Sequence, residues 1–244
     1  MDAVVVAFIS GKGGTGKTAL SAFVASALAA RDKKILLVEL SGCLRNMDIV
    51  TDTGSDTVYD LHDVLTGKCA PYKAIVKSPH AEGLYVISAP YSGGEVPVSA
   101  LQQFYDRMKT YFDYILLDVA SGLGDAFTAA AAVAQRVVLV LTPDPIALRD
   151  GRFLADSLPE SVQQVHMLIN KVPPGGLPIG GPVQDLDEAI DQVAVPLLGV
   201  VPQSNEIFCA AATGKPLPPA SLEGRVFAAI ASRMEGTDTP LLMR

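Results

Sequence analysis

The residues between positions 10 and 18 hold the clearest chemical pattern in the chain, Ser-Gly-Lys-Gly-Gly-Thr-Gly-Lys-Thr. Gly11 and Gly16, followed by Lys17 and Thr18, match a phosphate-binding loop, in which small residues let backbone N–H groups point at phosphate oxygens. The lysine would reach the β- and γ-phosphates of ATP, and the threonine hydroxyl would bind Mg²⁺. A simple glycine turn with two solvated lysines is the alternative. It does not explain why an apolar strand precedes the loop and an apolar helix follows it, as the motif requires.

The elements that must position this loop alternate along the chain. Apolar runs rich in β-branched residues predict buried strands, and segments of helical periodicity lie between them. The predicted strands are residues 4–9, 35–38, 84–87, 114–117, 137–141, 165–169 and 197–201. The predicted helices are residues 19–30, 60–65, 98–111, 127–134, 147–158, 186–193 and 222–234. This alternation favours an α/β fold, a doubly wound, mostly parallel sheet with helices on both faces.

The number of domains follows from the same alternation. A chain of 244 residues is long enough for one large domain or two small ones. The segment 173–182 reads Pro-Pro-Gly-Gly-Leu-Pro-Ile-Gly-Gly-Pro, and it predicts a surface loop because proline lacks a donor and glycine resists ordering. A domain linker fits less well, since a further strand and helix must return to the same sheet. We therefore expect residues 1–244 to form a single nucleotide-binding domain.

Composition limits the class of partner and the compartment. The net charge of −7 argues against broad nonspecific binding of nucleic acid, which needs clustered Lys and Arg. Cys43, Cys69 and Cys209 are widely spaced, which favours neither a disulfide framework nor a structural zinc site. No basic segment precedes the first apolar run, so that run predicts a buried strand rather than a signal peptide. A cytoplasmic protein is expected.

Asp118 is the second chemical feature, because ligands in doubly wound folds bind outside the carboxyl ends of the strands. It directly follows the predicted strand 114–117. There it fits a Walker B carboxylate, which would hold Mg²⁺ directly or through water. A solvated aspartate at a strand end is the alternative.

An early lysine, Lys12, gives the loop the form Lys-Gly-Gly-x-Gly-Lys-Thr, which resembles the deviant Walker A loop of the MinD/ParA ATPases. The similarity continues collinearly over nearly the whole chain, in Leu-Arg-Asn-x-Asp at 44–48, Val-Tyr-Asp at 58–60 and Leu-Gly-Val-Val-Pro at 198–202. It implies a Mg²⁺-dependent ATPase that acts as a nucleotide-controlled dimerisation switch, in placement of the cell-division site or other spatial regulation. Lys12 would then reach across an ATP-dependent homodimer to the partner's phosphates; a solvent-facing lysine is the alternative.

The resemblance assigns roles residue by residue. It implies catalytic roles for Lys12, Lys17 and Asp118, and metal binding by Thr18 and Asp118. Asn170 would hydrogen-bond the adenine, although an amide that caps a turn is an alternative for it. The nucleotide contacts implied in this way are Gly11, Lys12, Gly13, Gly14, Thr15, Gly16, Lys17, Thr18, Ala19, Asn170 and Pro202.

Ser41 departs from the family pattern, because the MinD-like ATPases have an aspartate at its position. A serine hydroxyl cannot take a proton as a carboxylate can near neutral pH, and losing such a group removes about 10²- to 10⁴-fold from a rate. We therefore expect tight ATP binding with slow hydrolysis. Glu39, Asp48 or Asp125 could substitute as the carboxylate. Residues 118–122 resemble the family segment Asp-x-Pro-Ala-Gly, with Ala120 in place of the proline and Ser121 in place of the alanine.

The C-terminal segment 239–244 reads Thr-Pro-Leu-Leu-Met-Arg. Members similar to MinD end in a basic amphipathic helix that inserts into the membrane surface, and six residues that contain Pro240 cannot form such a helix. We therefore expect no autonomous membrane binding through this end. A regulatory or cargo protein remains the expected partner of the dimer.

Three other functions compete with the ATPase switch. The first is a non-hydrolysing, ATP-dependent scaffold that recruits a partner protein, which Ser41 favours. The second is a DNA-partitioning ParA-type ATPase, which the acidic charge makes less consistent. The third is an iron–sulfur carrier of the same superfamily, for which only Cys43, near the loop after the second strand, is a candidate ligand.

Overall fold

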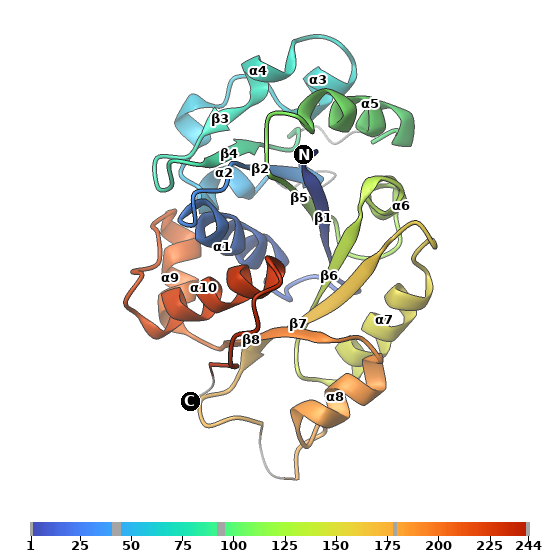
Figure 1. Ribbon diagram of the computed structural model, residues 1–244, viewed down its shortest axis with the longest axis vertical. Helices are drawn as coiled ribbons and strands as arrows, with labels where there is room; N and C mark the ends of the chain where they lie inside the picture. Colours follow the sequence, from blue (N-terminus) through green and yellow to red (C-terminus); the bar gives the residue numbers. More distant parts are fainter. Residues whose placement is uncertain (1, 41–44, 92–95, 178–179, 243–244) are drawn as a thin grey trace.

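The computed structural model describes residues 2–40, 45–91, 96–177 and 180–242, and in them an eight-stranded sheet forms the centre of the molecule (Figure 1). The strands are β1 (Val4–Ile9), β2 (Ile35–Leu40), β3 (Val76–Lys77), β4 (Leu84–Ile87), β5 (Tyr114–Val119), β6 (Arg136–Leu141), β7 (Gln164–Val172) and β8 (Leu197–Pro202). Their order across the sheet is β3-β4-β2-β5-β1-β6-β7-β8. β3 runs antiparallel to β4 and the other pairs are parallel, so the predicted mostly parallel sheet is confirmed.

The central place of β1 positions the site. β1 lies between β5 and β6, and Phe8 of β1 is in register with Asp118 of β5. Because parallel strands end at the same edge of a sheet, the loop after β1 lies beside the end of β5 and the loop after β6. The residues with predicted chemistry therefore meet at one edge.

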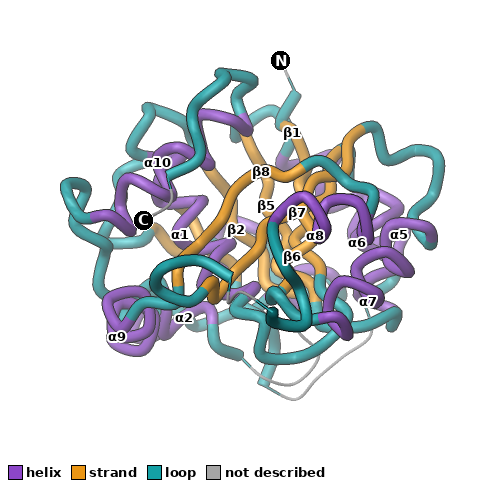
Figure 2. Tube along the Cα trace, turned by 90° about the horizontal axis from the view of Figure 1, so that it is seen from below, coloured by secondary structure: helices purple, strands orange, loops and turns teal. Residues whose placement is uncertain are grey.

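Helices cover both faces of the sheet, as predicted. Figure 2 shows α1, α2, α9 and α10 on one side of the strands and α5 to α8 on the other. Alternation along the strands builds one apolar core under each layer: Val5 and Ala7 of β1 face one core, and Val6 and Phe8 face the other. The helices are α1 (Lys17–Ala29), α2 (Met47–Val50), α3 (Leu61–Leu65), α4 (Pro71–Ala74), α5 (Val98–Met108), α6 (Asp125–Val133), α7 (Pro145–Asp156), α8 (Leu186–Val193), α9 (Asn205–Thr213) and α10 (Leu222–Met234).

Several boundaries differ from the predicted ones. α1 begins two residues before position 19 because Gly16 takes a left-handed conformation and forms its N-cap. α5 ends at Met108 rather than at 111. The short elements β3, α2 and α4, and the longer α9, were not predicted; Ser204 caps α9 by accepting hydrogen bonds from the N–H groups of Glu206 and Ile207.

The remaining segments follow the sequence expectations where the structure describes them. Residues 173–177 and 180–182 form a loop, and residues 237–242, after α10, contain no helix. Among the helices described, none has the length and apolar character that a membrane crossing requires.

Candidate nucleotide-binding site

The loop between β1 and α1 has a backbone that requires glycine at defined places. Gly14 and Gly16 have φ values of +78° and +91°, a left-handed region that glycine enters without steric cost. A Cβ atom at Gly16 would overlap Nδ2 of Asn170. Gly13 and Gly14 lie exposed at the surface of the loop. No side chain caps the N-terminus of α1, so its first N–H groups face the loop as an anion site would need.

Replacing Gly16 with alanine is expected to destabilise the protein by about 1 to 3 kcal/mol, because the added methyl both strains the backbone and displaces Asn170. ATP binding should weaken with it, since Asn170 holds the loop. Gly13→Ala is the matched control: an added Cβ there meets no atom within 4 Å. The midpoint of urea unfolding of each variant checks the difference. Equal stability of the two variants would contradict this account of the loop.

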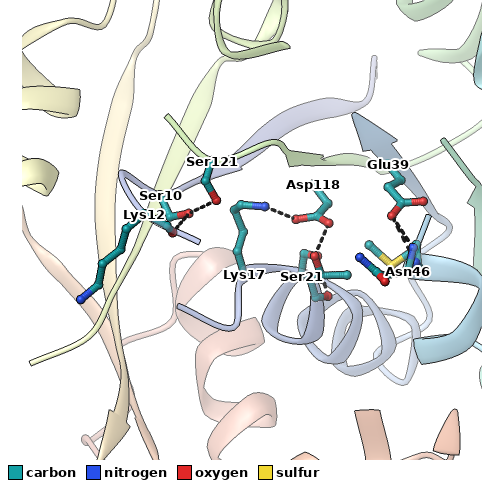
Figure 3. A network of polar contacts seen from close by, with 10 residues as sticks. Ser10, Lys12, Lys17, Ser21, Glu39, Asn46, Asp118 and Ser121 are labelled. Carbon is teal, nitrogen blue, oxygen red and sulfur yellow. Dashed lines mark hydrogen bonds and ion pairs between the residues drawn. The ribbon is translucent and has the colours of Figure 1, made fainter. Parts of the chain in front are cut away.

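Lys17 and Thr18, at the start of α1, both contact Asp118, and Figure 3 shows the contact of Lys17. Nζ of Lys17 donates to Oδ1 of Asp118 over 2.9 Å, and the Thr18 hydroxyl donates to Oδ2 of the same carboxylate over 2.6 Å. Asp118 is 1% exposed, and Lys17 is buried as well. A buried carboxylate needs a cation or strong donors to remain charged. Lys17 supplies the cation and Thr18 a further donor to Asp118.

The donor chemistry of this cluster fits ATP with Mg²⁺. A carboxylate and a hydroxyl oxygen are ligands that Mg²⁺ prefers, and the ion binds proteins through few side chains together with phosphate oxygens. Asp118 and Thr18, whose oxygens lie 2.6 Å apart, could hold the metal. Lys17, at the N-terminus of α1, could hold the phosphates.

Lys12 points away from Lys17 and Asp118 (Figure 3). Its Nζ forms an ion pair with Oδ2 of Asp144 over 2.7 Å, and both side chains are about one-third exposed, 38% and 33%. Asp144 also accepts from the Thr142 hydroxyl and caps α7 through the Ala147 N–H. Burial acts to raise the pKa of Asp144, but these hydrogen bonds outweigh burial and lower the pKa. Asp144 is therefore a charged partner for Lys12 within the same chain.

Asn170 holds the loop through an amide contact. Its Nδ2 donates to the carbonyl oxygen of Thr15 over 2.7 Å, and the side chain is buried. The next residue, Lys171, has φ +60° and donates from Nζ to the Gly14 carbonyl over 2.7 Å. Lys171 was not among the predicted site residues, although a lysine directly after Asn170 at a strand end was a signal for it. The end of β7 thus supports the loop from the side.

Pro202 and Ala19 lie at the edges of the same site. Pro202 ends β8, in register with Val172 of β7, and Ala19 belongs to the first turn of α1. Pro202 lies on β8, the neighbour of the strand β7 that carries Asn170. The resemblance places the adenine base beside these two residues. The role of both residues in nucleotide binding stays a prediction.

Glu39 is a buried carboxylate near Asp118. Its Oε1 accepts from the N–H groups of Asn46 and Met47 over 2.8 and 3.2 Å, and its Oε2 accepts from the Ala89 N–H over 3.0 Å. Burial raises the pKa of Glu39, with a smaller contribution from the charge of Asp118, although the three N–H donors act in the opposite direction. Glu39 therefore joins the end of β2 to the start of α2 and to the segment after β4.

The other candidate carboxylates and Ser121 differ in their surroundings. Asp48 forms a buried ion pair with Arg45 over 2.8 Å, whereas Asp125 is exposed at the start of α6. The Ser121 hydroxyl lies 3.2 Å from that of Ser10. The predictions for Ser41 and Cys43 fall outside the described residues.

Comparison with known proteins decides the family. A family model described as an AAA domain matches residues 3–171. The septum site-determining protein MinD of Synechocystis sp. is 32% identical over 98% of this chain and 91% of its own length. The MinD of Bacillus subtilis is 30% identical over the same shares. The chain belongs to the MinD/ParA family. A solved MinC:MinD cell division protein complex of Aquifex aeolicus matches it with a TM-score of 0.90 at 26% identity, over 98% of each chain.

Membership in the MinD/ParA family confirms the predicted resemblance and the P-loop NTPase fold. The members of this family are P-loop ATPases, so the loop at 10–18 belongs to an ATP-binding fold. The MinD/ParA membership also agrees with the convergence of Lys17, Thr18 and Asp118 at the edge of the sheet. The individual roles of these residues remain predictions.

Proposed function

We propose that this MinD/ParA protein is a cytoplasmic, Mg²⁺-dependent ATPase whose ATP-bound form dimerises and recruits a partner protein, in placement of the division site or another spatial task. A single domain of residues 1–244 would carry this function. The observation that supports it most is the buried cluster of Lys17, Thr18 and Asp118 under a glycine-rich loop. That cluster joins the groups that phosphate and Mg²⁺ need in one place.

Each residue of the site has a defined task in this proposal. Thr18 and Asp118 would bind Mg²⁺, which neutralises charge on the phosphates. Lys17 would leave its contact with Asp118 and bind the β- and γ-phosphates. The backbone N–H groups from Gly11 to Ala19 would bind the phosphate oxygens. Asn170 keeps the loop in shape through Thr15, next to the expected site of the adenine. Binding by such a site depends on positioned charges and donors more than on proton transfer.

Slow hydrolysis is part of the proposal. Ser41 offers no carboxylate, and two of the three residues that could replace one already have other partners. Both oxygens of Glu39 accept backbone N–H groups, and Asp48 is paired with Arg45. A carboxylate occupied in this way is a poor base for an attacking water. These contacts support an ATP state that persists long enough to act as a signal.

A partner protein is the expected receiver of that signal. A MinD of Aquifex aeolicus has been solved in a complex with MinC, which supports a protein partner here by similarity. A scaffold that binds ATP without hydrolysing it is the second candidate, and the lack of a carboxylate at Ser41 favours it. Measured turnover separates the two, because only the ATPase releases phosphate.

Lys12 and Asp144 give the dimerisation proposal its sharpest test. Lys12→Ala should weaken the MgATP-dependent dimer by about tenfold or more, because a charge-assisted contact to the partner's phosphates is lost. Asp144→Asn should strengthen the dimer by a few-fold at most: asparagine still caps α7, but it no longer pairs with Lys12, and a pair this exposed is worth about 0 to 1 kcal/mol. Sedimentation equilibrium with MgATP measures both constants.

Lys77→Ala, an exposed lysine on β3, is the control for loss of positive charge. If Lys12→Ala dimerises as tightly as this control, Lys12 is only a solvent-facing lysine. An unchanged constant for Asp144→Asn would show that the pair within one chain does not compete with the dimer.

A further inference from the structure

A cavity lies at the end of the sheet opposite to the phosphate-binding loop. It has a volume of about 500 Å³. It is lined by Val6, Arg136, Val138, His166, Leu198 and Arg233, among others. Arg136 is the first residue of β6, whereas the phosphate-binding loop follows the last residue of β1. The cavity therefore lies at the amino ends of the strands, beside the C-terminal end of α10.

Two arginines give this cavity its charge. Arg136 donates to the Met234 carbonyl over 2.8 Å, and Arg233 donates to the carbonyls of Leu198 and Thr239. Among the residues that the structure describes, neither arginine forms an ion pair with a carboxylate. Both side chains are partly buried. Main-chain carbonyls fix the direction of a guanidinium group but leave its charge uncompensated.

The nearby acid does not compensate that charge. Glu235, which also lines the cavity, pairs with Arg31 and with Lys33, the latter over 3.3 Å. The carboxylate of Glu235 is thus engaged by two other cations, and the cavity keeps the positive charge of Arg136 and Arg233 in a chain whose net charge is −7. A local positive excess in an acidic protein, at a concave surface, favours an anionic ligand.

His166 lies in the same cavity, in register with Val138. Burial lowers its pKa, and the positive charge of Arg136 lowers it further. The charged or titratable groups around it are Arg136 on β6, Arg233 on α10, Glu235 after α10 and Tyr114 on β5. An anion bound beside Arg136 would oppose that repulsion and raise the pKa of His166, which makes the imidazole a reporter.

We propose that this cavity binds a small phosphomonoester, with its phosphate on Arg136 and Arg233 and its organic group against Val6, Val138 and Leu198. Nε and Nη2 of Arg233 already hold the Thr239 carbonyl, so the phosphate would use the remaining N–H groups of Arg233 and those of Arg136 beyond the contact of its Nη1 to Met234. Inorganic phosphate alone would leave much of the cavity unfilled, since pockets for small organic ligands have volumes of about 300 to 1,000 Å³. This site is separate from the ATP site and does not depend on the proposed ATPase function.

Phenyl phosphate is the probe for the test, and the NMR signals of the histidine imidazoles are the readout. The protein is first saturated with MgADP so that the phosphate-binding loop is filled, and ionic strength is kept constant. We expect the His166 signal to shift with saturation and its pKa to rise, while the signals of His62 and His80 stay in place. While phenyl phosphate keeps both charges, binding should tighten as pH falls toward the pKa of His166 in the free protein, because the charged imidazole attracts the anion. Protonation of the phosphate itself at about pH 6 opposes this gain at lower pH.

Arg136→Gln should weaken phenyl phosphate by about tenfold, the effect of losing one charge-assisted contact. Arg152→Gln, which removes a surface arginine paired with Asp156, should leave the affinity unchanged. Arg136→Lys keeps the charge and covers the case in which the glutamine variant fails to fold. A His166 signal that does not move in the wild type would overturn the proposal, and so would an equal response to benzoate or to sodium chloride.

Discussion

Lys17→Met is expected to reduce ATP binding by about 10²-fold or more, the effect of removing a positioned donor from a phosphate site. The same change removes the cation that pairs with Asp118. Asp118 is buried, and among the described residues it would keep only the Thr18 hydroxyl as a side-chain donor. Breaking a buried ion pair from one side costs about 3 to 5 kcal/mol, so the variant should also unfold at lower urea. Fluorescence titration with an ATP analogue and urea unfolding measure the two effects.

A double variant separates binding from stability. Lys17→Met with Asp118→Asn removes both charges, so the stability should return toward that of the wild type, whereas ATP binding should stay lost. Lys77→Met, at the exposed position of β3, controls for loss of a lysine elsewhere. If Lys17→Met binds ATP like this control, the loop is not the nucleotide site that its sequence indicates.

Ser41→Asp is expected to raise the rate of ATP hydrolysis by about 10²- to 10⁴-fold, because it returns a carboxylate to the place where the family has one. Ser41 lies outside the described residues, so the support comes from its sequence position and from Glu39. Since three backbone N–H groups hold Glu39, it is a poor substitute for the missing base. Phosphate release at saturating MgATP measures the gain.

Ser55→Asp is the control, because Ser55 is exposed in the 3₁₀ helix Gly54–Asp56. This substitution adds the same charge away from the site. Turnover in the wild type at the rate of ordinary MinD-like enzymes would contradict slow hydrolysis, and Asp125 would then become the leading carboxylate. No gain in Ser41→Asp would show that the base is not what limits the rate.

Elements with a local signature were predictable from the sequence. β1 is a continuous apolar run, and its burial in the centre of the sheet follows from that run. The loop after it carries its chemistry in adjacent residues, and Asp118 stands at the end of the next central strand. The family resemblance added Lys12 and Asn170, which residue spacing alone would not have assigned to a nucleotide.

Contacts that depend on the order of strands were not predictable. The partner of Lys12 is Asp144, which is 132 positions away and comes close only because β6 lies next to β1. α2 has four residues and no side-chain cap of its own. Its first N–H groups bind Glu39 instead, a residue of another element. Tertiary contacts stabilise such a short helix, and the helix propensity of its own residues does not predict it.

The central claim is that ATP controls association of this protein with itself, and light scattering of the wild type tests it most directly. The molar mass is measured with MgATP, with MgADP and without nucleotide at one protein concentration. If hydrolysis is slow, the ATP state persists through the measurement. We expect the mass to double with MgATP and to remain that of the monomer in the other two samples. The same mass in all three would contradict the account, since the nucleotide would then not act as a dimerisation switch.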